Sequence, residues 1–339
     1  MTYEISSRTL HFREPAGTSR GTYLTRQVWY VTLTDDEGNT GMGECAPLPH
    51  LSCDDRPDYE AVLHDRCLQV CTTGRIDYEA LRPYPSILFG LECALLMLRR
   101  RSRILFDTPF TQGQIGMPIN GLVWMGTFEE MRQRMEAKME AGFRCIKIKI
   151  GAIDWAEEMA LLRALFPNRH KEERSVRVDA NGAFSPAEAP ERLQQLAALG
   201  IHSIEQPIRA GQWQEMAHLC QSTPLPIALD EELIGVNAPE QKALLLDTIR
   251  PQYIILKPSL HGGLRGCDEW IHLANRRGIG WWATSALESN VGLSAIAQWV
   301  SQYRPETAQG LGTGQLYTDN TEAETEVRSD EIFCTLKQS

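Results

Sequence analysis

The chain has 339 residues, of which 42% are hydrophobic and 23% are charged. These values exclude a disordered or fibrous protein and suit one large domain with a smaller second module. The formal net charge of −10, without a basic stripe, argues against a nucleic-acid partner. The nine cysteines form no CxxC pair or Cys/His cluster with zinc-ligand spacing, so we expect free thiols in a reducing compartment.

The N-terminus lacks the apolar stretch of a secretory signal. The longest apolar stretch, residues 87–98, contains Glu92 and is too short to cross a bilayer. We therefore expect a cytoplasmic protein that does not bind membranes. The arginines at 99–103 follow this stretch, and we interpret them as a solvated helix end. The sequence leaves the oligomeric state open.

The first part of the chain, residues 1–110, has mixed α+β character. Residues 28–33 are β-branched and aromatic, residues 35–39 are polar with a glycine, and residues 40–44 follow as a second short strand. This order predicts a β-hairpin. Residues 85–98 predict a largely buried helix.

From about residue 113 short apolar runs alternate with amphipathic stretches, which predicts a parallel sheet closed as a barrel over residues 111–312. The eight expected strands are residues 116–120, 145–150, 176–179, 203–205, 227–230, 253–257, 280–284 and, more weakly, 309–312.

Two capping boxes predict helix starts in this part of the chain, at residues 127–130 and 185–188. Gly142 and Gly200 are placed to end these helices. The second box puts Pro186 at the first helical position, so Pro190 should remove an early hydrogen bond of that helix.

Charged residues interrupt the apolar strands where the strands end. Lys147 and Lys149 share one face of their strand, and the strands that follow end in Asp179, Glu205, Asp230 and Lys257. The intervals are each about one strand–helix unit. Because the carboxyl ends of barrel strands converge on one mouth, we expect a single site there. A solvated strand end is the simpler interpretation of any one of these charges, but not of the ordered series.

Three clustered carboxylates repel one another unless a cation lies between them. We expect Asp179, Glu205 and Asp230 to bind Mg²⁺, with Mn²⁺ as an alternative occupant. A metal bound to a substrate carboxylate would stabilise the enediolate formed when a proton leaves the α-carbon. A lysine crowded by a cation and by another ammonium can act as the base. Lys149, beside Lys147 and the metal, has such neighbours, and Lys257 faces it from the other side.

These segments carry a family resemblance that covers nearly the whole chain. Lys147-Ile148-Lys149, the segments at 179–181, 205–207 and 230–231, and Lys257-Pro258-Ser259 resemble the motifs of the muconate-lactonizing-enzyme subgroup of the enolase superfamily. Within that subgroup the chain is most similar to the o-succinylbenzoate synthase family. The resemblance implies an α/β fold, a (β/α)7β TIM-like barrel, with an α+β capping domain formed by the N-terminal region and the C-terminal tail at 313–339.

The resemblance also implies roles. Lys149 would take the α-proton and help hydroxide leave as water, and Lys257 would stabilise the intermediate by its charge, including a cation–π contact to the substrate ring. Asn181 and Glu231 would support the metal ligands without binding the ion. Residues 41–49 resemble a capping-loop segment that contacts the substrate, although a plain turn rich in Gly and Pro would look similar.

Substrate choice depends on the last two strands. The sequence at 285–289 resembles a SxxES motif, so Thr284 and Ser285 are candidates to bind a substrate carboxylate, although a capped helix start would look similar. Gly310 and Gly312 are further candidates, and their segment lacks the DxD that dipeptide epimerases use for a substrate amino group. Ala283-Thr284, in place of histidine, argues against the mandelate-racemase subgroup.

We therefore expect a lyase that acts on a small carboxylate: syn dehydration of a cyclohexadiene carboxylate, a step toward menaquinone. The alternative of the same subgroup is racemisation of N-acylamino acids or epimerisation of dipeptides. A hypothesis of another class is a catalytically inactive barrel that binds an acidic metabolite. No motif supports a structural assembly protein.

Overall fold

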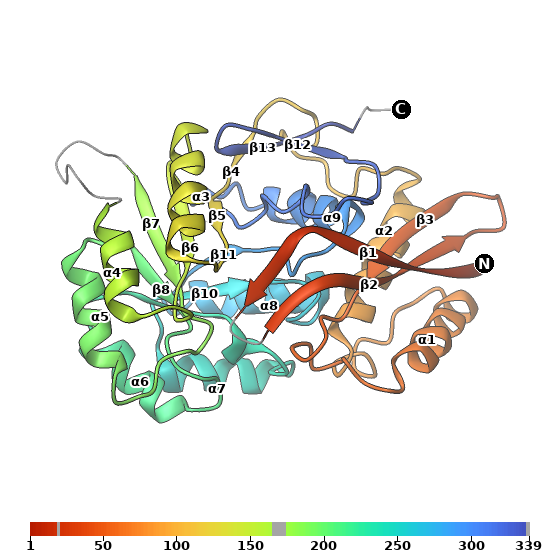
Figure 1. The fold of residues 1–339 in the computed structure, drawn as a ribbon. Helices are drawn as coiled ribbons and strands as arrows, with labels where there is room; N and C mark the ends of the chain where they lie inside the picture. The colour runs from red at the N-terminus through yellow and green to blue at the C-terminus, as the bar shows by residue number, and fades with distance from the viewer. Residues whose placement is uncertain (19–20, 165–173, 337–339) are drawn as a thin grey trace.

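The computed structural model describes residues 1–18, 21–164 and 174–336. Its first part is an antiparallel sheet of three strands, β1 (Thr2–Thr18), β2 (Gly21–Thr34) and β3 (Thr40–Cys45), which extends across the front of the molecule (Figure 1). The Asp35 carboxylate accepts hydrogen bonds from the backbone N–H groups of Glu37 and Asn39, which closes the turn between β2 and β3. The predicted hairpin is confirmed.

Two helices complete the first part, α1 (Tyr59–Thr73) and α2 (Pro85–Arg100). Proline at the start of α2 fixes a helical φ where no hydrogen-bond donor is needed. Helix α2 lies directly on β3 because Gly43 and Gly90 have no side chains. A Cβ at Gly43 would lie 1.8 Å from the Gly90 carbonyl oxygen. The predicted buried helix is confirmed, and Arg99 and Arg100 at its end are exposed as expected.

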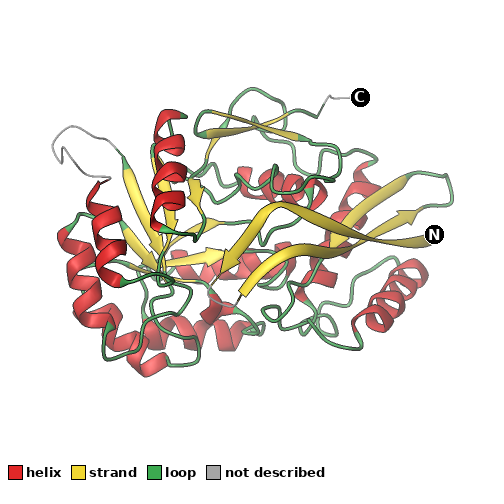
Figure 2. Ribbon diagram, viewed as in Figure 1, coloured by secondary structure: helices red, strands yellow, loops and turns green. Residues whose placement is uncertain are grey.

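The second part is a curled sheet of parallel strands in the order β11-β10-β9-β8-β7-β6-β5, with helices on its outer side (Figure 2). The strands are β5 (Gly121–Val123), β6 (Cys145–Lys149), β7 (Ser175–Asp179), β8 (Ser203–Glu205), β9 (Ile227–Leu229), β10 (Tyr253–Leu256) and β11 (Gly280–Ala283). The helices are α3 (Phe128–Glu140), α4 (Trp155–Ala164), α5 (Ala189–Ala198), α6 (Trp213–Ser222), α7 (Pro239–Ile249), α8 (Gly263–Asn275), α9 (Asn290–Ser301) and the short 3-10 helix η1 (Glu231–Leu233).

The first strand of this sheet differs from the prediction of residues 116–120. Met117–Pro118 forms a separate strand, β4, that pairs with β13 (Glu331–Cys334) near the C-terminus. The parallel sheet instead begins at β5, three residues later, where Gly121 pairs with Ile146. The local pattern placed an apolar run correctly but could not identify its partner, which lies more than two hundred residues away.

The two edges of the curled sheet are joined by residues 309–310. Ile119 and Gln309 form one isolated parallel bridge, and Thr284 and Gly310 form another. The backbone N–H of Asn120 donates to the Gln309 carbonyl at 2.9 Å, and that of Gly310 donates to the Ala283 carbonyl at 2.8 Å. The expected last strand at 309–312 is therefore only a pair of bridges. We call residues 309–313, with Ile119 and Asn120 beside them, the seam.

The capping boxes have different outcomes. The box at residues 127–130 is confirmed: Thr127 and Glu130 exchange the expected hydrogen bonds at the start of α3. The side chains of Ser185 and Glu188 also bond one another, but α5 begins only at Ala189. The expectation that Pro190 disturbs the helix was wrong, because it lies in the first turn of α5, where its missing N–H costs nothing.

The C-terminal segment contacts both parts. Strand β12 (Thr325–Arg328) pairs with β13, which pairs with β4. Upstream of them, Leu316 and Thr318 hydrogen-bond to Arg13 and His11 of β1 through their backbones. Limits of 1–110, 111–312 and 313–339 for the domains stay a prediction, and residues 337–339 lie outside the described residues.

The nine cysteines are free, and seven of them are buried. None of the described helices is long and apolar enough to span a membrane.

Candidate active site

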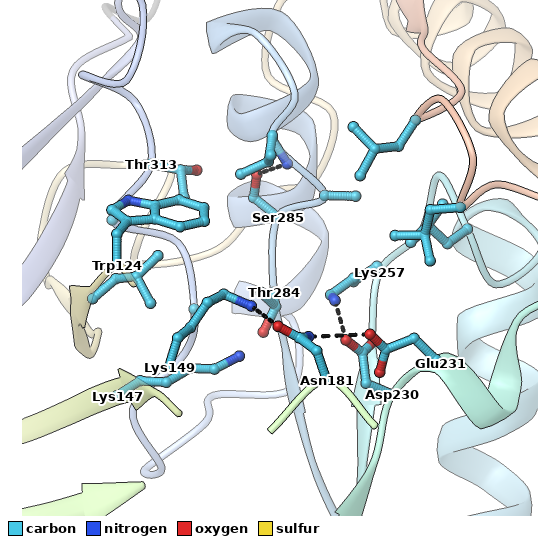
Figure 3. Close-up of a pocket in the computed structure, with 18 of the residues that line it drawn as sticks. Trp124, Lys147, Lys149, Asn181, Asp230, Glu231, Lys257, Thr284, Ser285 and Thr313 are labelled. Carbon is cyan, nitrogen blue, oxygen red and sulfur yellow. Dashed lines mark hydrogen bonds and ion pairs between the residues drawn. The ribbon is translucent and has the colours of Figure 1, made fainter. Parts of the chain in front are cut away.

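A cavity opens at the carboxyl ends of the parallel strands, and charged side chains line one side of it (Figure 3). Strand register brings the charges together. Lys149 on β6 pairs with Asp179 on β7, and Asp179 pairs with Glu205 on β8. Three neighbouring strands therefore end at one level, and side chains at corresponding positions point to the same face of the sheet. Asp230 directly follows β9 on the next position around the ring.

Two lysines of β6 approach the carboxylates from one side. Lys147 Nζ lies 2.8 Å from Asp179 Oδ2 and 2.7 Å from Glu205 Oε2. Lys149 Nζ lies 3.0 Å from Asp179 Oδ2 and donates to Asn181 Oδ1 at 2.6 Å. Alternating residues of one strand thus reach the same carboxylate from two heights in the barrel.

Lys257 approaches from the other side of the ring, at the end of β10. Its ammonium pairs with the Asp230 carboxylate. Asn181 connects Lys149 with Glu231, because its amide nitrogen donates to Glu231 Oε1 at 3.1 Å while its oxygen accepts from Lys149. Asn181 has a φ of 45°, a left-handed conformation that Asn tolerates better than most residues. The sequence-predicted lysines, Asp179, Glu205, Asp230, Asn181 and Glu231 therefore lie together.

Burial and pairing set the charge states of this cluster. Burial alone would raise the pKa of Asp179, but the Lys147 and Lys149 charges outweigh it and hold that pKa well below its usual range. Burial, together with the Asp179 charge, raises the pKa of Glu205 well above its usual value. Burial and the neighbouring Asp230 raise the pKa of Glu231 to about 7. The site thus holds more carboxyl groups than it can keep ionised with its own cations.

The carboxylates do not form a ready-made metal cage. In the described part of the chain, no three His, Cys, Asp or Glu side chains are grouped to hold a metal ion. The lysines explain this, because the ammonium groups of Lys147 and Lys257 lie against the carboxylates. Two buried oxygens, Asp230 Oδ1 and Glu231 Oε2, have no hydrogen-bond partner. Unsatisfied hard oxygen atoms beside ionised carboxylates fit a divalent cation.

The loop after β11 forms another wall of the cavity. Ser285 Oγ donates to Glu288 Oε2 at 2.8 Å and accepts from the Leu287 N–H at 2.9 Å. Glu288 also accepts from the hydroxyl of Ser259, two residues after Lys257. The only hydroxyl proton of Ser285 is thus engaged within the protein. Thr284 lines the cavity, as Ser285 does, and lies against Gly310, whose Cβ would be 2.5 Å from Thr284 Oγ1. Substrate binding by these residues and by Gly312 stays a prediction.

Residues of the first part and of the C-terminal segment hold this loop in place. The buried Arg26 guanidinium of β2 donates to the carbonyls of Ala286 and Ala46. Tyr317 donates its hydroxyl proton to the Leu287 carbonyl at 2.6 Å. Glu44 of β3 accepts from the backbone N–H and hydroxyl of Ser289 at the start of α9. The wall of the cavity is therefore set by contacts between the two parts of the molecule.

Sequence reasoning missed Tyr23 of β2 and three further polar or aromatic residues of the cavity wall. Asn120 and Trp124 precede and follow Leu122 at alternate positions, and all three line the cavity. The Trp124 ring lies 5.8 Å from Lys149 Nζ. Thr313, beyond the seam glycines, is the third. The period of two at 120, 122 and 124 was a usable signal, but the strand had been placed too early.

Two parts of the chain match known protein families. Residues 130–336 match the family described as "Enolase C-terminal domain-like", and residues 19–98 match "MenC, N-terminal domain". The chain belongs to the enolase superfamily.

Individual relatives identify the family within the superfamily to which the chain belongs. An o-succinylbenzoate synthase of Desulfotalea psychrophila is 47% identical over 94% of this chain and 95% of its own length. The crystal structure of MenC from the same organism superimposes with a TM-score of 0.82 over 98% of this chain and 100% of that one, at 41% identity. The chain belongs to the o-succinylbenzoate synthase family.

More distant relatives are also informative. A Thermosynechococcus elongatus o-succinylbenzoate synthase, solved with Mg in its active site, has a TM-score of 0.72 at 25% identity, covering 91% of this chain and 92% of that one. An L-Ala-D/L-Glu epimerase of Bacillus subtilis is 25% identical over 89% of this chain and 84% of its own length. Proteins that share this fold therefore include both synthases and epimerases.

Proposed function

We propose that this chain is an o-succinylbenzoate synthase, a lyase of menaquinone biosynthesis. It removes water from a cyclohexadiene carboxylate that carries a succinyl side chain and gives aromatic o-succinylbenzoate. The 47% identical synthase of Desulfotalea psychrophila supports this choice of substrate. The site is carried by a (β/α)7β barrel in which the seam takes the place of the eighth strand.

One observation carries the proposal: lysines stand on both sides of the carboxylates. Strands β6 and β10 flank the three strands that carry Asp179, Glu205 and Asp230. Lys149 comes from the first and Lys257 follows the second. A substrate whose carboxylate is drawn to the acidic side through a cation would have an ammonium or amine at each face of its α-carbon.

The residues give a balanced elimination. Lys149, as the general base, takes the α-proton, and the electron pair of the broken C–H bond passes into the substrate carboxylate as an enediolate. That pair then forms the new C=C bond as the C–OH bond breaks. The Lys149 ammonium then returns a proton to the leaving hydroxide on the same face, which gives water and restores the base. Lys257, held as a cation by Asp230, stabilises the negative charge that develops on the substrate. Asn181 orients Lys149 through its 2.6 Å hydrogen bond.

Asp179, Glu205 and Asp230 would hold a divalent cation, with Glu231 and Asn181 supporting them. When bound, the cation supplies positive charge to the substrate carboxylate and acidifies the α-proton. We propose Mg²⁺, as in the Thermosynechococcus elongatus structure, with Mn²⁺ as an alternative.

The test is to incubate the purified protein and Mg²⁺ in parallel with the cyclohexadiene carboxylate and with N-acylamino acids or dipeptides. We expect formation of the aromatic product, and its loss on addition of EDTA. Turnover by Lys149→Ala equal to wild type, or no product from wild type under any divalent cation, would contradict the proposal and favour a binding protein.

Racemisation of N-acylamino acids or epimerisation of dipeptides is the second candidate. The opposed lysines favour it too, because two-sided proton transfer needs one base on each face. The seam residues Gly310 and Gly312 carry no carboxylate for a substrate amino group. Inversion at the α-carbon without dehydration in the parallel incubation would select this activity.

A further inference from the structure

Two polar side chains line the cavity at the seam and make no hydrogen bond to any residue that the structure describes. Asn120 Oδ1 and Thr313 Oγ1 are both inaccessible to solvent and without a partner. Asn120 is 4% exposed and Thr313 is 5% exposed, and both line the same cavity as the lysines. Buried polar groups nearly always have a partner, so two orphaned groups in one cavity indicate that a ligand supplies it.

Their place in the ring separates them from the charged groups. Asn120 immediately precedes β5, and Thr313 is the last residue of the seam that joins β5 to β11. The carboxylates belong to β7, β8 and the end of β9, which lie on the opposite side of the ring. In Figure 3 Thr313 lies on the opposite side of the view from Asp230 and Glu231. A ligand that reaches both groups must extend across the cavity.

The seam itself leaves space for such a ligand. Gly310 and Gly312, which have no side chains, line the cavity together with the two polar groups. A Cβ at Gly312 would meet its nearest atom only at 3.4 Å, so this position is not glycine for want of room in the fold. Gly312 therefore leaves space in the cavity wall that Asn120 and Thr313 also line.

We propose that Asn120 and Thr313 form a binding subsite for the oxo-acid side chain of the substrate. The inference rests on the proposed function, since the succinyl side chain has two acceptor groups, a ketone and a terminal carboxylate. The Asn120 amide and the Thr313 hydroxyl offer one donor to each. A flip of the Asn120 amide places its nitrogen, a donor, where Oδ1 lies, because the two ends of the amide are nearly equal in size. This subsite fixes the far end of the substrate, while the lysines act on the ring.

The experiment measures equilibrium binding by calorimetry in Mg²⁺, with no reaction to follow. The ligands are the product o-succinylbenzoate, 2-butyrylbenzoate, which lacks the terminal carboxylate, 2-(3-carboxypropyl)benzoate, which lacks the ketone, and benzoate. The variants are Asn120→Leu and Thr313→Val, which keep shape and remove the hydrogen-bonding groups. Thr321→Val is the matched control, because Thr321 Oγ1 is also buried without a partner but does not line the cavity.

We expect each cavity variant to bind o-succinylbenzoate about ten- to a hundredfold more weakly than wild type, as the loss of one buried hydrogen bond to a ligand predicts. The loss of affinity in each variant should vanish for one of the two analogues, the one that lacks the acceptor bound by the removed side-chain group. Thr321→Val should bind as wild type does. Unchanged affinity in both variants, or an equal loss for benzoate, would overturn the subsite. Melting curves confirm that each variant is folded.

Wild-type turnover separates this outcome from failure of the proposed function. If wild type dehydrates the substrate while Asn120→Leu and Thr313→Val keep full affinity, only the subsite is wrong. If wild type neither dehydrates the substrate nor binds the product, the proposed function itself fails.

Discussion

Lys149 is the residue whose chemistry is most specific. It is buried, shares Asp179 with Lys147 and is oriented by Asn181. We predict that Lys149→Ala lowers kcat by a factor of about 10² to 10⁴, the usual contribution of a general base. Affinity for o-succinylbenzoate should change much less, because the remaining lysines and the seam still bind it. Steady-state kinetics and calorimetry measure both quantities. Lys138→Ala, on α3 outside the cavity, is the control and should match wild type.

Glu92 provides a pH-dependent prediction away from the site. It is buried where α2 meets α8 and accepts hydrogen bonds from the N–H groups of Leu264 and Arg265, yet burial raises its pKa from 4.5 to about 8. The folded state therefore binds this proton more tightly than the unfolded state. Its contribution to stability is complete below about pH 4.5 and is lost as the pH rises to about 8.

Urea unfolding of wild type and Glu92→Gln at several pH values tests this sign. The variant should gain on wild type as the pH rises, at no more than about 1.4 kcal/mol per pH unit. Glu140→Gln, on the exposed end of α3, should show no such trend. A difference between Glu92→Gln and wild type that stays constant from pH 5 to 8 would refute the assignment.

At the level of elements, the loop between β11 and α9 is the point where the two parts of the molecule meet. Tyr317 fixes this loop through the Leu287 carbonyl, and Leu287 itself has a left-handed φ of 64°. We predict that Tyr317→Phe raises KM severalfold with little change in kcat, because the wall of the cavity loosens while Lys149 stays in place. Steady-state kinetics gives both constants.

The control for this prediction is Tyr303→Phe. Tyr303 also donates its hydroxyl proton, to Asp268 at 2.5 Å, but does not line the cavity. Both variants should lose about 1 kcal/mol or somewhat more of unfolding free energy. An equal rise of KM in both would show that general destabilisation, and not the loop, is responsible.

The success of sequence reasoning differed between elements. Strands such as β6, β7 and β8 were found because buried parallel strands are apolar and end in charges at regular intervals. Strand β1 was not identified, because most of its side chains are exposed and give no apolar run. Strand β4 was assigned to the barrel because its pairing with β13 depends on residues distant in the chain.

The same physical limit applies to the site. The charged residues could be named because strand periodicity alone brings them to one mouth. The engagement of Ser285 with Glu288 could not be foreseen from a motif that also suits substrate binding. Asn120 and Thr313 could be recognised as candidate binding residues only from the structure, because the seam brings them into one cavity and leaves them without hydrogen-bond partners.

For the molecule as a whole, a divalent cation should bind the folded state and not the unfolded one. Asp230 Oδ1, which has no hydrogen-bond partner, is an open ligand position for it. We predict that Mg²⁺ raises the melting temperature of wild type in a concentration-dependent way, by mass action. Asp230→Asn should abolish this increase, whereas Asp247→Asn, on the exposed side of α7, should retain it. An equal increase in both variants would place the cation elsewhere.

The most direct test of the account follows the α-proton itself. Wild type with Mg²⁺ is given the cyclohexadiene carboxylate carrying deuterium at the α-carbon, and the aromatic product is followed by absorbance. We expect product formation that needs a divalent cation, a slower rate with the deuterated substrate, and near-complete loss in Lys149→Ala. Exchange of deuterium with solvent without any aromatic product, or undiminished product formation by Lys149→Ala, would contradict it.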